Sequence, residues 1–141
     1  MRPVYALLKN KETPWSIKPQ DSVFDALKTL ADHDVGALMV MEQGKLVGIL
    51  SERDYTRKIA LAGKASRDTR VEEIMTTTVL TVSPKATTDE CMALMSQRKI
   101  RHLPVMDGER VLGMISIRDI MDDMLKDREE TINQLQSYIV S

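Results

Sequence analysis

The sequence predicts a mixed α/β fold built from two tandem copies of one strand, helix, strand, strand, helix unit. Residues 15–55 align without a gap onto residues 80–120 at a constant offset of 65, and eight of the 41 aligned pairs are identical. Both copies carry the same order of apolar runs, amphipathic stretches and turns, which is typical of an internal repeat. We therefore expect two repeats related by a pseudo-twofold axis, with any site present twice.

Short strands are expected at the start and in the middle of each repeat. The opening strands fall at 15–17 and 79–82, where each apolar run is followed by a proline that lacks the N–H a β-ladder needs. Hairpins are expected at 37–50 and 103–115, because Gln-Gly and Asp-Gly separate apolar runs and glycine adopts positive φ at low cost. The nearly continuous apolar runs indicate strands covered on both faces.

Two helices complete each repeat. The first begins after a hydroxyl residue, Ser22 or Thr87, that is followed three positions later by an acid, which is the capping-box pattern. The second begins after Ser51 or Ser116. In the first repeat this helix is expected to end near Gly63, a suitable residue for the position after a helix.

These patterns divide the chain into four parts. Repeat 1 is expected over residues 5–62, a polar linker over 63–70, repeat 2 over 71–125 and a helical tail over 126–141. The length of 141 residues is close to the roughly 150 residues typical of one domain. Because a lone unit of about 60 residues is marginally stable, we expect the repeats to fold together as one module.

The end of the chain carries an amphipathic stripe interrupted by the charged run 127–130. Two roles are open for it, a helix that covers the module or a dimer contact. We favour the covering role, because an amphipathic stripe usually packs on the local core. The stripe consists of Ile120, Met124, Ile132, Leu135 and Ile139.

Composition excludes several classes of protein. The chain has 20 basic and 21 acidic residues and a pI of about 6.1, which argues against nucleic-acid binding. The apolar stretch at 4–8 is shorter than the 7 to 15 residues of a secretory signal or the 18 or more of a membrane span, so we expect no membrane association. The single cysteine, Cys91, fits a reducing compartment, and we expect the cytoplasm.

The most informative motif is Gly-x-x-Ser-x-Arg-Asp, which occurs at 48–54 and at 113–119. Each copy joins a strand end to a helix start, where free backbone N–H groups and the helix dipole favour an anion. The serine can donate to a phosphate, the arginine can neutralise it, and the aspartate can accept hydrogen bonds from ribose hydroxyls. The same Ser-x-x-Asp spacing is also an ordinary helix-capping pattern, so these residues alone leave both roles open.

The order of the units and this motif resemble a cystathionine-β-synthase (CBS) domain pair, over roughly residues 5–125. The segments 48–55 and 100–105 are similar to stand-alone bacterial and plant-organelle members that consist of little besides this pair. The resemblance implies tandem CBS repeats packed with pseudo-twofold symmetry, and two clefts that bind adenosine-containing ligands. It also implies a homodimer, since family members commonly pack two pairs into a disc.

The resemblance assigns roles to residues of both repeats. It implies that Asp54 and Asp119 hold ribose, while Ser51 and Ser116 approach phosphate. The adenine pockets would be lined by the first strands and the starts of the second strands. The implied nucleotide-binding residues are Ile17, Val35, Gly36, Ala37, Ser51, Arg53 and Asp54 in one repeat, and Val82, Ile100, Arg101, His102, Pro104, Ser116, Arg118 and Asp119 in the other.

The two repeats differ in charge at the start of the second strand. The first repeat has Gly36-Ala37, whereas the second has Arg101-His102. In similar modules a basic pair at this point reaches phosphate. We therefore expect the second repeat to offer positive charge that the first lacks.

No pattern of a catalytic or metal site is present. We find no carboxylate pair, no nucleophile with a base and no P-loop, and His33, His102 and Cys91 form no zinc-ligand set. We therefore expect a non-enzymatic regulatory sensor that requires no cofactor and binds AMP, with ATP, ADP, NAD or S-adenosylmethionine as alternative ligands. The competing hypothesis is an interaction platform that regulates a partner enzyme, for example a redox protein such as thioredoxin, without sensing nucleotides.

Overall fold

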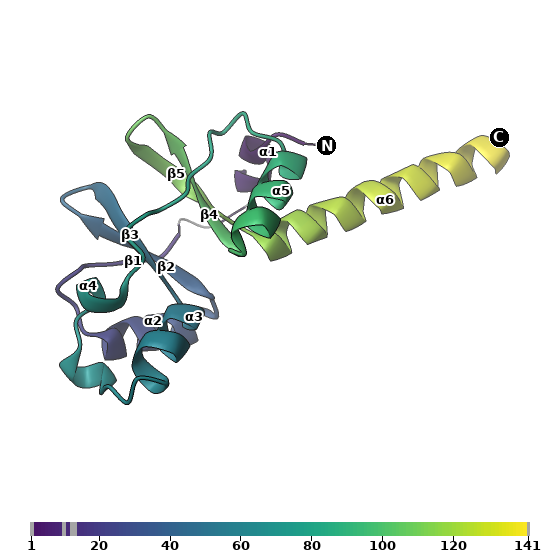
Figure 1. Ribbon diagram of the computed structural model, residues 1–141. Coiled ribbons are helices and arrows are strands. Elements are labelled where there is room, and N and C mark those ends of the chain that lie inside the picture. The colour runs from purple at the N-terminus through teal and green to yellow at the C-terminus, as the bar shows by residue number, and fades with distance from the viewer. Residues whose placement is uncertain (1, 10, 12–13, 141) are drawn as a thin grey trace.

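The two repeats lie side by side, each with helices packed on a small sheet (Figure 1). The computed structural model describes residues 2–9, 11 and 14–140, without the side chains of 131 and 138–140. The first repeat contains β1 (Ser16–Ile17), α2 (Val23–His33), β2 (Ala37–Glu42), β3 (Lys45–Ser51), α3 (Glu52–Tyr55) and the π-helical η1 (Thr56–Ala60). The second contains α5 (Thr88–Arg98), β4 (His102–Asp107), β5 (Arg110–Ser116) and α6 (Ile117–Val140). The remaining elements are α1 (Val4–Leu8), the 3-10 helix η2 (Ser66–Asp68) and α4 (Val71–Ile74). The predicted mixed fold of two like repeats is confirmed.

Both predicted hairpins are present, and their turns follow the glycines. Gln43 and Gly44 both have positive φ (50° and 77°) between β2 and β3, and Gly108 has φ 61° between β4 and β5. Each hairpin has a register shift at the same repeat position, after Val40 and after Val105. The repeated bulge indicates that the two sheets are bent in the same way.

The opening strands differ between the repeats. β1 pairs in parallel with β2. The prediction of a strand at 79–82 is wrong, because this segment forms only a single parallel bridge, between Val82 and Val105. In the first repeat the Met39 N–H donates to the Trp15 carbonyl (3.3 Å). Pro104 stands at the position equivalent to Met39 and has no N–H, so the second ladder cannot extend beyond Val82.

Each core is completed by a short helix that precedes the other repeat in sequence. α1 packs on the second repeat and α4 on the first (Figure 1). Matched backbone hydrogen bonds anchor the two helices, so their attachment follows the pseudo-twofold axis. The donors and acceptors are Val4 N to Ala86 O (2.7 Å) and Tyr5 N to Pro84 O (3.1 Å), matched by Val71 N to Asp21 O (2.8 Å) and Glu72 N to Pro19 O (3.0 Å).

The glycine of the duplicated motif makes room for these crossing segments. A Cβ at Gly48 would lie 2.7 Å from Met75 Sδ and 3.0 Å from the Thr76 carbonyl oxygen. A Cβ at Gly113 would lie 2.8 Å from Leu8 Cδ2. The motif glycine therefore allows close approach of a chain segment from outside the repeat.

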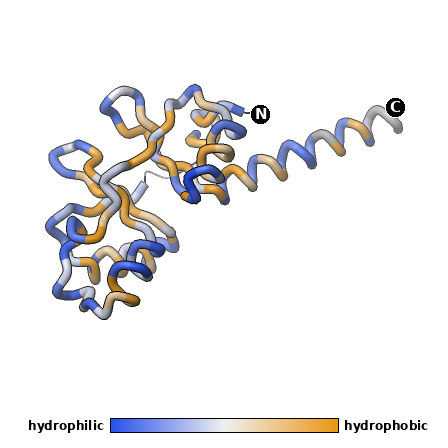
Figure 2. Tube along the Cα trace, viewed as in Figure 1, coloured by the Kyte–Doolittle hydropathy of each residue, from blue (hydrophilic) through white to orange (hydrophobic). Residues whose placement is uncertain are grey.

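The repeats meet through apolar residues on alternate positions of their strands. The strands are largely apolar (Figure 2). In β2, Leu38 and Val40 face the helices of their own repeat, whereas Ala37 and Met39 form a separate buried cluster with Met114 of β5. This alternation is the period of a strand covered on both faces, as predicted from the continuous apolar runs.

The tail does not cover the module. α6 runs without interruption from the second repeat and projects away from it (Figure 1). Ile120 and Asp123 are buried, whereas Ile132 and Leu135 are exposed; the side chain of Ile139 lies outside the described residues. The covering role expected from the stripe is therefore wrong, because the helix leaves the core after its second turn. Among the described residues no helix, α6 included, has the length and apolarity needed to cross a membrane.

We predict that Gly48→Ala destabilises the protein by about 1 to 3 kcal/mol, the usual effect of overpacking. The added methyl group would press on the Thr76 carbonyl, which is fixed by its hydrogen bond from the Ile49 N–H (3.0 Å). Gly113→Ala is the matched control, because its methyl group meets only the mobile end of Leu8. Urea unfolding measures both variants, and equal losses would contradict this account of the glycines.

Candidate functional site

The two motif corners lie where a hairpin ends and a helix begins. Ser51 ends β3 opposite Ala37, and Ser116 ends β5 opposite His102. The first residue of the helix that follows donates its N–H to the carbonyl of the residue just before the facing strand. These hydrogen bonds run from Glu52 N to Gly36 O (3.1 Å) and from Ile117 N to Arg101 O (2.8 Å). The sheet register therefore holds the start of the second strand beside the serine and aspartate of its own repeat.

Both motif aspartates cap their helices. The Ser51 N–H donates to Asp54 Oδ2 (3.0 Å) while the Asp54 N–H donates to Ser51 Oγ (3.2 Å). The Ser116 N–H donates to Asp119 Oδ2 (2.8 Å), and the Asp119 N–H donates to Ser116 Oγ (3.2 Å). The capping role that the spacing left open is thus present in both copies, and it engages Oδ2 of each carboxylate.

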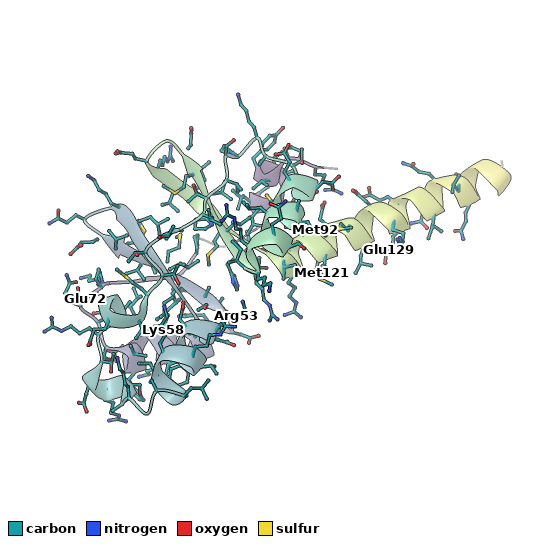
Figure 3. The ribbon with its side chains drawn as sticks, viewed as in Figure 1. Arg53, Lys58, Glu72, Met92, Met121 and Glu129 are labelled. Atoms are coloured by element: carbon teal, nitrogen blue, oxygen red, sulfur yellow. The ribbon has the colours of Figure 1, made fainter. Side chains whose placement is uncertain are left out.

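In the first corner the other carboxylate oxygen is also engaged. Asp54 Oδ1 accepts a hydrogen bond from the Thr76 hydroxyl (3.3 Å) and pairs with Lys58 Nζ (3.3 Å). Lys58, labelled in Figure 3, also donates to the Ile74 carbonyl (2.8 Å), so its position is fixed from two sides. With only 13% of its side chain exposed, Asp54 has its hydrogen-bonding needs met by the protein itself.

The second corner is more open. Lys11, from the segment after α1, donates to Asp119 Oδ2 and to the Met114 carbonyl (2.6 Å). Asp119 Oδ1 accepts no hydrogen bond from any residue that the structure describes, and 26% of the side chain is exposed. This carboxylate therefore keeps one oxygen available to a ligand hydroxyl.

Charge and burial at the second corner shift two pKa values. Burial alone would raise the pKa of Asp119, but the hydrogen bonds from Lys11 and Ser116 outweigh it, and the pKa is lowered. The pKa of His102 is also lowered, first by burial and then by the positive charge of Lys11, against a smaller opposing effect of Asp119. Near neutral pH the corner therefore presents an anionic carboxylate and a neutral imidazole.

Two contacts join the corners across the pair. The His102 ring lies against Gly36, where an added Cβ would be 3.3 Å from Cε1. Arg53, on α3 (Figure 3), donates to the Lys99 carbonyl (2.7 Å) just after α5. Its guanidinium is therefore bound to the second repeat and not to the serine or aspartate of its own motif. The structure thus brings His102 next to the first repeat, while Arg53 ties the two repeats together.

The other predicted residues differ in exposure. Arg101 and Arg118 are exposed. Ile17, Ala37 and Pro104 are buried. The half-buried residues are Val35, Gly36, Ser51, Asp54, Val82, Ile100, His102, Ser116 and Asp119.

Sequence reasoning missed the partners of the motif acids, namely Lys11, Lys58 and Thr76. Lys11 and Thr76 lie 65 residues apart, the offset of the repeat, in the segments that precede the aligned regions. Extending the gapless alignment outward by four residues would have paired Lys11 with Thr76, although the helices before them correspond at an offset of 67, Val4 with Val71 and Tyr5 with Glu72. Their difference in type, a lysine and a threonine, hid the relation.

The described side chains offer hydrogen-bond acceptors and cations, and no group of three or more His, Cys, Asp or Glu residues among them could hold a metal ion. Cys91 is buried in the second core, and burial, followed by the charge of Glu90, raises the pKa of its thiol. A raised pKa disfavours the reactive thiolate. The arrangement is suited to reversible binding of a polar ligand.

Comparison with known proteins agrees with the architecture. The CBS domain family model matches residues 10–61 and 71–126. A mitochondrial CBS domain-containing protein of Arabidopsis thaliana, CBSX3, is 40% identical over 124 residues, which cover 84% of this chain and 60% of that protein. This chain therefore spans less than two thirds of the length of that relative.

Two solved structures show the same fold. A CBS-domain protein from Burkholderia ambifaria is 44% identical with a TM-score of 0.86, covering 89% of this chain and 96% of that one. The CBS domain pair of protein MJ0100, solved with 5′-methylthioadenosine and S-adenosyl-L-methionine, is 29% identical with a TM-score of 0.80, covering 90% of this chain and 98% of that one.

We predict that Lys11→Met lowers the free energy of unfolding by about 0.5 to 1 kcal/mol at pH 7, the range for a partly exposed ion pair. The folded pKa of Asp119 is depressed, so its stabilisation is complete above the unfolded value of about 4 and is lost as the pH falls through the folded value. The loss caused by the substitution should therefore shrink below about pH 4.

Urea unfolding of both proteins across this pH range tests the pair. Lys9→Met is the matched control, because Lys9 is exposed two residues away in the sequence and its substitution removes the same charge. A deficit of constant size from pH 7 to pH 2 would show that Lys11 stabilises the protein by some means other than its pairing with Asp119.

Proposed function

Because the chain belongs to the CBS-domain family, a family of regulatory modules, we propose that it is a non-catalytic sensor of adenosine nucleotides, with AMP as its ligand. The observation that carries the proposal is the second corner. There Asp119 Oδ1 accepts no hydrogen bond from the described residues, Lys11 donates to Oδ2, and Arg101 and His102 lie at the start of the strand that faces Ser116. A carboxylate beside cationic groups suits a ribose next to a phosphate. The adenosine ligands in the MJ0100 structure support this class of ligand.

The two corners are unequal in this proposal, and the second is the primary site. Ribose at Asp54 would have to displace the Thr76 hydroxyl or the Lys58 ammonium, whereas ribose at Asp119 can use Oδ1 directly. The phosphate would meet Arg101 and Lys11, which the first repeat replaces by Gly36 and Thr76. ATP, ADP, NAD and S-adenosylmethionine share the adenosine group and are the alternative ligands.

The expected affinity suits a metabolite sensor. AMP has about two dozen non-hydrogen atoms, and roughly 0.3 kcal/mol per atom gives about 7 kcal/mol, or a Kd on the order of 10 µM. A ligand that prefers one arrangement of the repeats shifts their relative geometry, and the shift is limited by its difference in affinity for the two arrangements. In this proposal the protein works as a homodimer in the cytoplasm, where a buried cysteine without a partner stays reduced.

The test is calorimetric titration of AMP into the wild type and into Asp119→Asn. The amide can still accept the Ser116 N–H, so the cap is retained while the charge is lost. We expect binding to weaken by about 1.5 to 3 kcal/mol, the range for hydrogen bonds to charged groups. Asp54→Asn is the matched control and should weaken binding less. Unchanged affinity in the double variant would reject the role of both acids.

The competing function is an interaction platform that regulates a partner enzyme, such as a redox protein, without binding nucleotides. The observation that favours it is the first corner, where the protein itself engages both Asp54 oxygens. A thermal-shift series with adenine nucleotides separates the two functions. A sensor gains stability with ligand concentration by mass action, whereas a platform melts at the same temperature throughout the series.

A further inference from the structure

We propose that α6 is a self-association helix whose exposed apolar face packs antiparallel against α6 of a second copy of this chain. The inference extends the homodimer proposed above and does not depend on nucleotide binding. α6 leaves the apolar core after Asp123 and projects from the module, as Figure 1 shows, while ion pairs from Arg2 to Asp127 and Glu130 accompany its next two turns. The projecting part, residues 124–140, would be about 25 Å long at 1.5 Å per residue.

A helix of this length needs a partner for its apolar side. Isolated helices of about 15 residues are marginal in water, and most helix stability in proteins comes from packing of one face. Apolar and polar stretches alternate along the projecting part (Figure 2). The exposed fractions are 54% for Met121, 46% for Met124, 57% for Leu125, 47% for Ile132 and 58% for Leu135.

The exposed apolar side chains follow a heptad pattern. Met121, Leu125, Ile132 and Leu135 fall at the steps of four and three residues that place side chains along one seam of a coiled coil. Met124 widens the seam on one side. Arg128 occupies the one position of the seam that is not apolar. This pattern fits a second helix as the partner, since a groove or flat sheet would not impose it.

The opposite face of α6 is held by the protein itself. Arg2 pairs with Asp123 (3.2 Å), Asp127 (3.2 Å) and Glu130 (3.8 Å), which lie four and three residues apart. The acidic face is therefore turned toward the N-terminal segment of the same chain. The heptad face, about 160° away by the helical period, is left pointing outward.

The spacing is self-complementary. Leu125 and Leu135 lie at equal distances in sequence on either side of residue 130, and so do Arg128 and Ile132. Two antiparallel copies related by a twofold axis near residue 130 would thus pair Leu125 with Leu135 of the second copy. A twofold contact of this kind requires a surface that matches itself, which favours a second copy over an unrelated protein.

Charge favours the antiparallel arrangement. Two parallel helices would stack Arg128 on Arg128 of the second copy inside the seam. In the antiparallel register each Arg128 instead lies beside Ile132 of the second copy and within one turn of Glu129 of the second copy. Glu129, labelled in Figure 3, is exposed on the projecting part of α6. The like-charge contact is thus replaced by an opposite-charge contact.

The first test measures mass in solution as a function of concentration, by sedimentation equilibrium of the full chain. The wild type should be a dimer, and Leu135→Glu should weaken the dimer by 100-fold or more, since the charge enters the seam at both ends. Gln134→Glu is the matched control, because it adds the same charge at the exposed neighbouring position and should leave the dimer intact. A wild-type monomer, or a Leu135→Glu dimer as tight as the control, would overturn the proposal.

The second test fixes the direction of the helices by disulfide crosslinking. Leu125→Cys and Leu135→Cys are made separately, then oxidised alone and as a mixture. In the antiparallel register only the mixture brings the two cysteines within bonding distance. Efficient crosslinking of each variant alone would establish a parallel pair and reject the register proposed here. The parent chain is the background control, because its cysteine is buried.

Titration of AMP into Leu135→Glu keeps the two proposals apart. A monomer that binds AMP supports both the self-association helix and the sensor. A monomer that does not bind AMP, beside a wild type that does, would place the dimer in the binding mechanism. A wild-type dimer that ignores AMP leaves the self-association helix supported and rejects the sensor.

Discussion

Each repeat depends on a segment that lies before the other repeat in the chain. Val4 and Leu8 complete the second core, and Val71 and Ile74 complete the first. Since a unit of about 60 residues is only marginally stable alone, this exchange favours folding of the pair as a single unit. It also carries Lys11 and Thr76 to the motif acids of the distant repeat. The same constraint thus produces both the fold and the environment of the candidate site.

The duplicated motif serves the fold and the site with the same atoms. Ser51 and Asp54 satisfy donors at a helix start, as do Ser116 and Asp119. A cap of this kind typically contributes about 1 kcal/mol, so it would be kept with or without a ligand. What distinguishes the corners is the second carboxylate oxygen, which a threonine and a lysine engage in the first repeat. The crossing segments, and not the motif, therefore decide whether that second oxygen is engaged by the protein.

The two corners are unequal, and the features that distinguish them lie together in the second repeat. That repeat contains the carboxylate with an unengaged oxygen among the described residues, His102 with its lowered pKa, and the start of α6. Asp119 lies in the first turn of α6, so a ligand bound at that carboxylate would touch the helix that leaves the module. His102 also contacts Gly36 of the first repeat. The second corner thus contacts the first repeat through His102 and belongs to the projecting helix through Asp119.

The sequence by itself determined the repeat, the hairpins and the two serine and aspartate corners, because these follow from local patterns of two to seven residues. It also located Cys91 in a core, through the helical period. The tertiary structure decided what depends on distant partners. Pro104 removed a donor from the second ladder, Lys11 reached Asp119 across 108 residues, and Met124, Ile132 and Leu135 of the α6 stripe stayed exposed while Ile120 was buried. Such contacts join positions far apart in sequence, and no local periodicity records which of them meet.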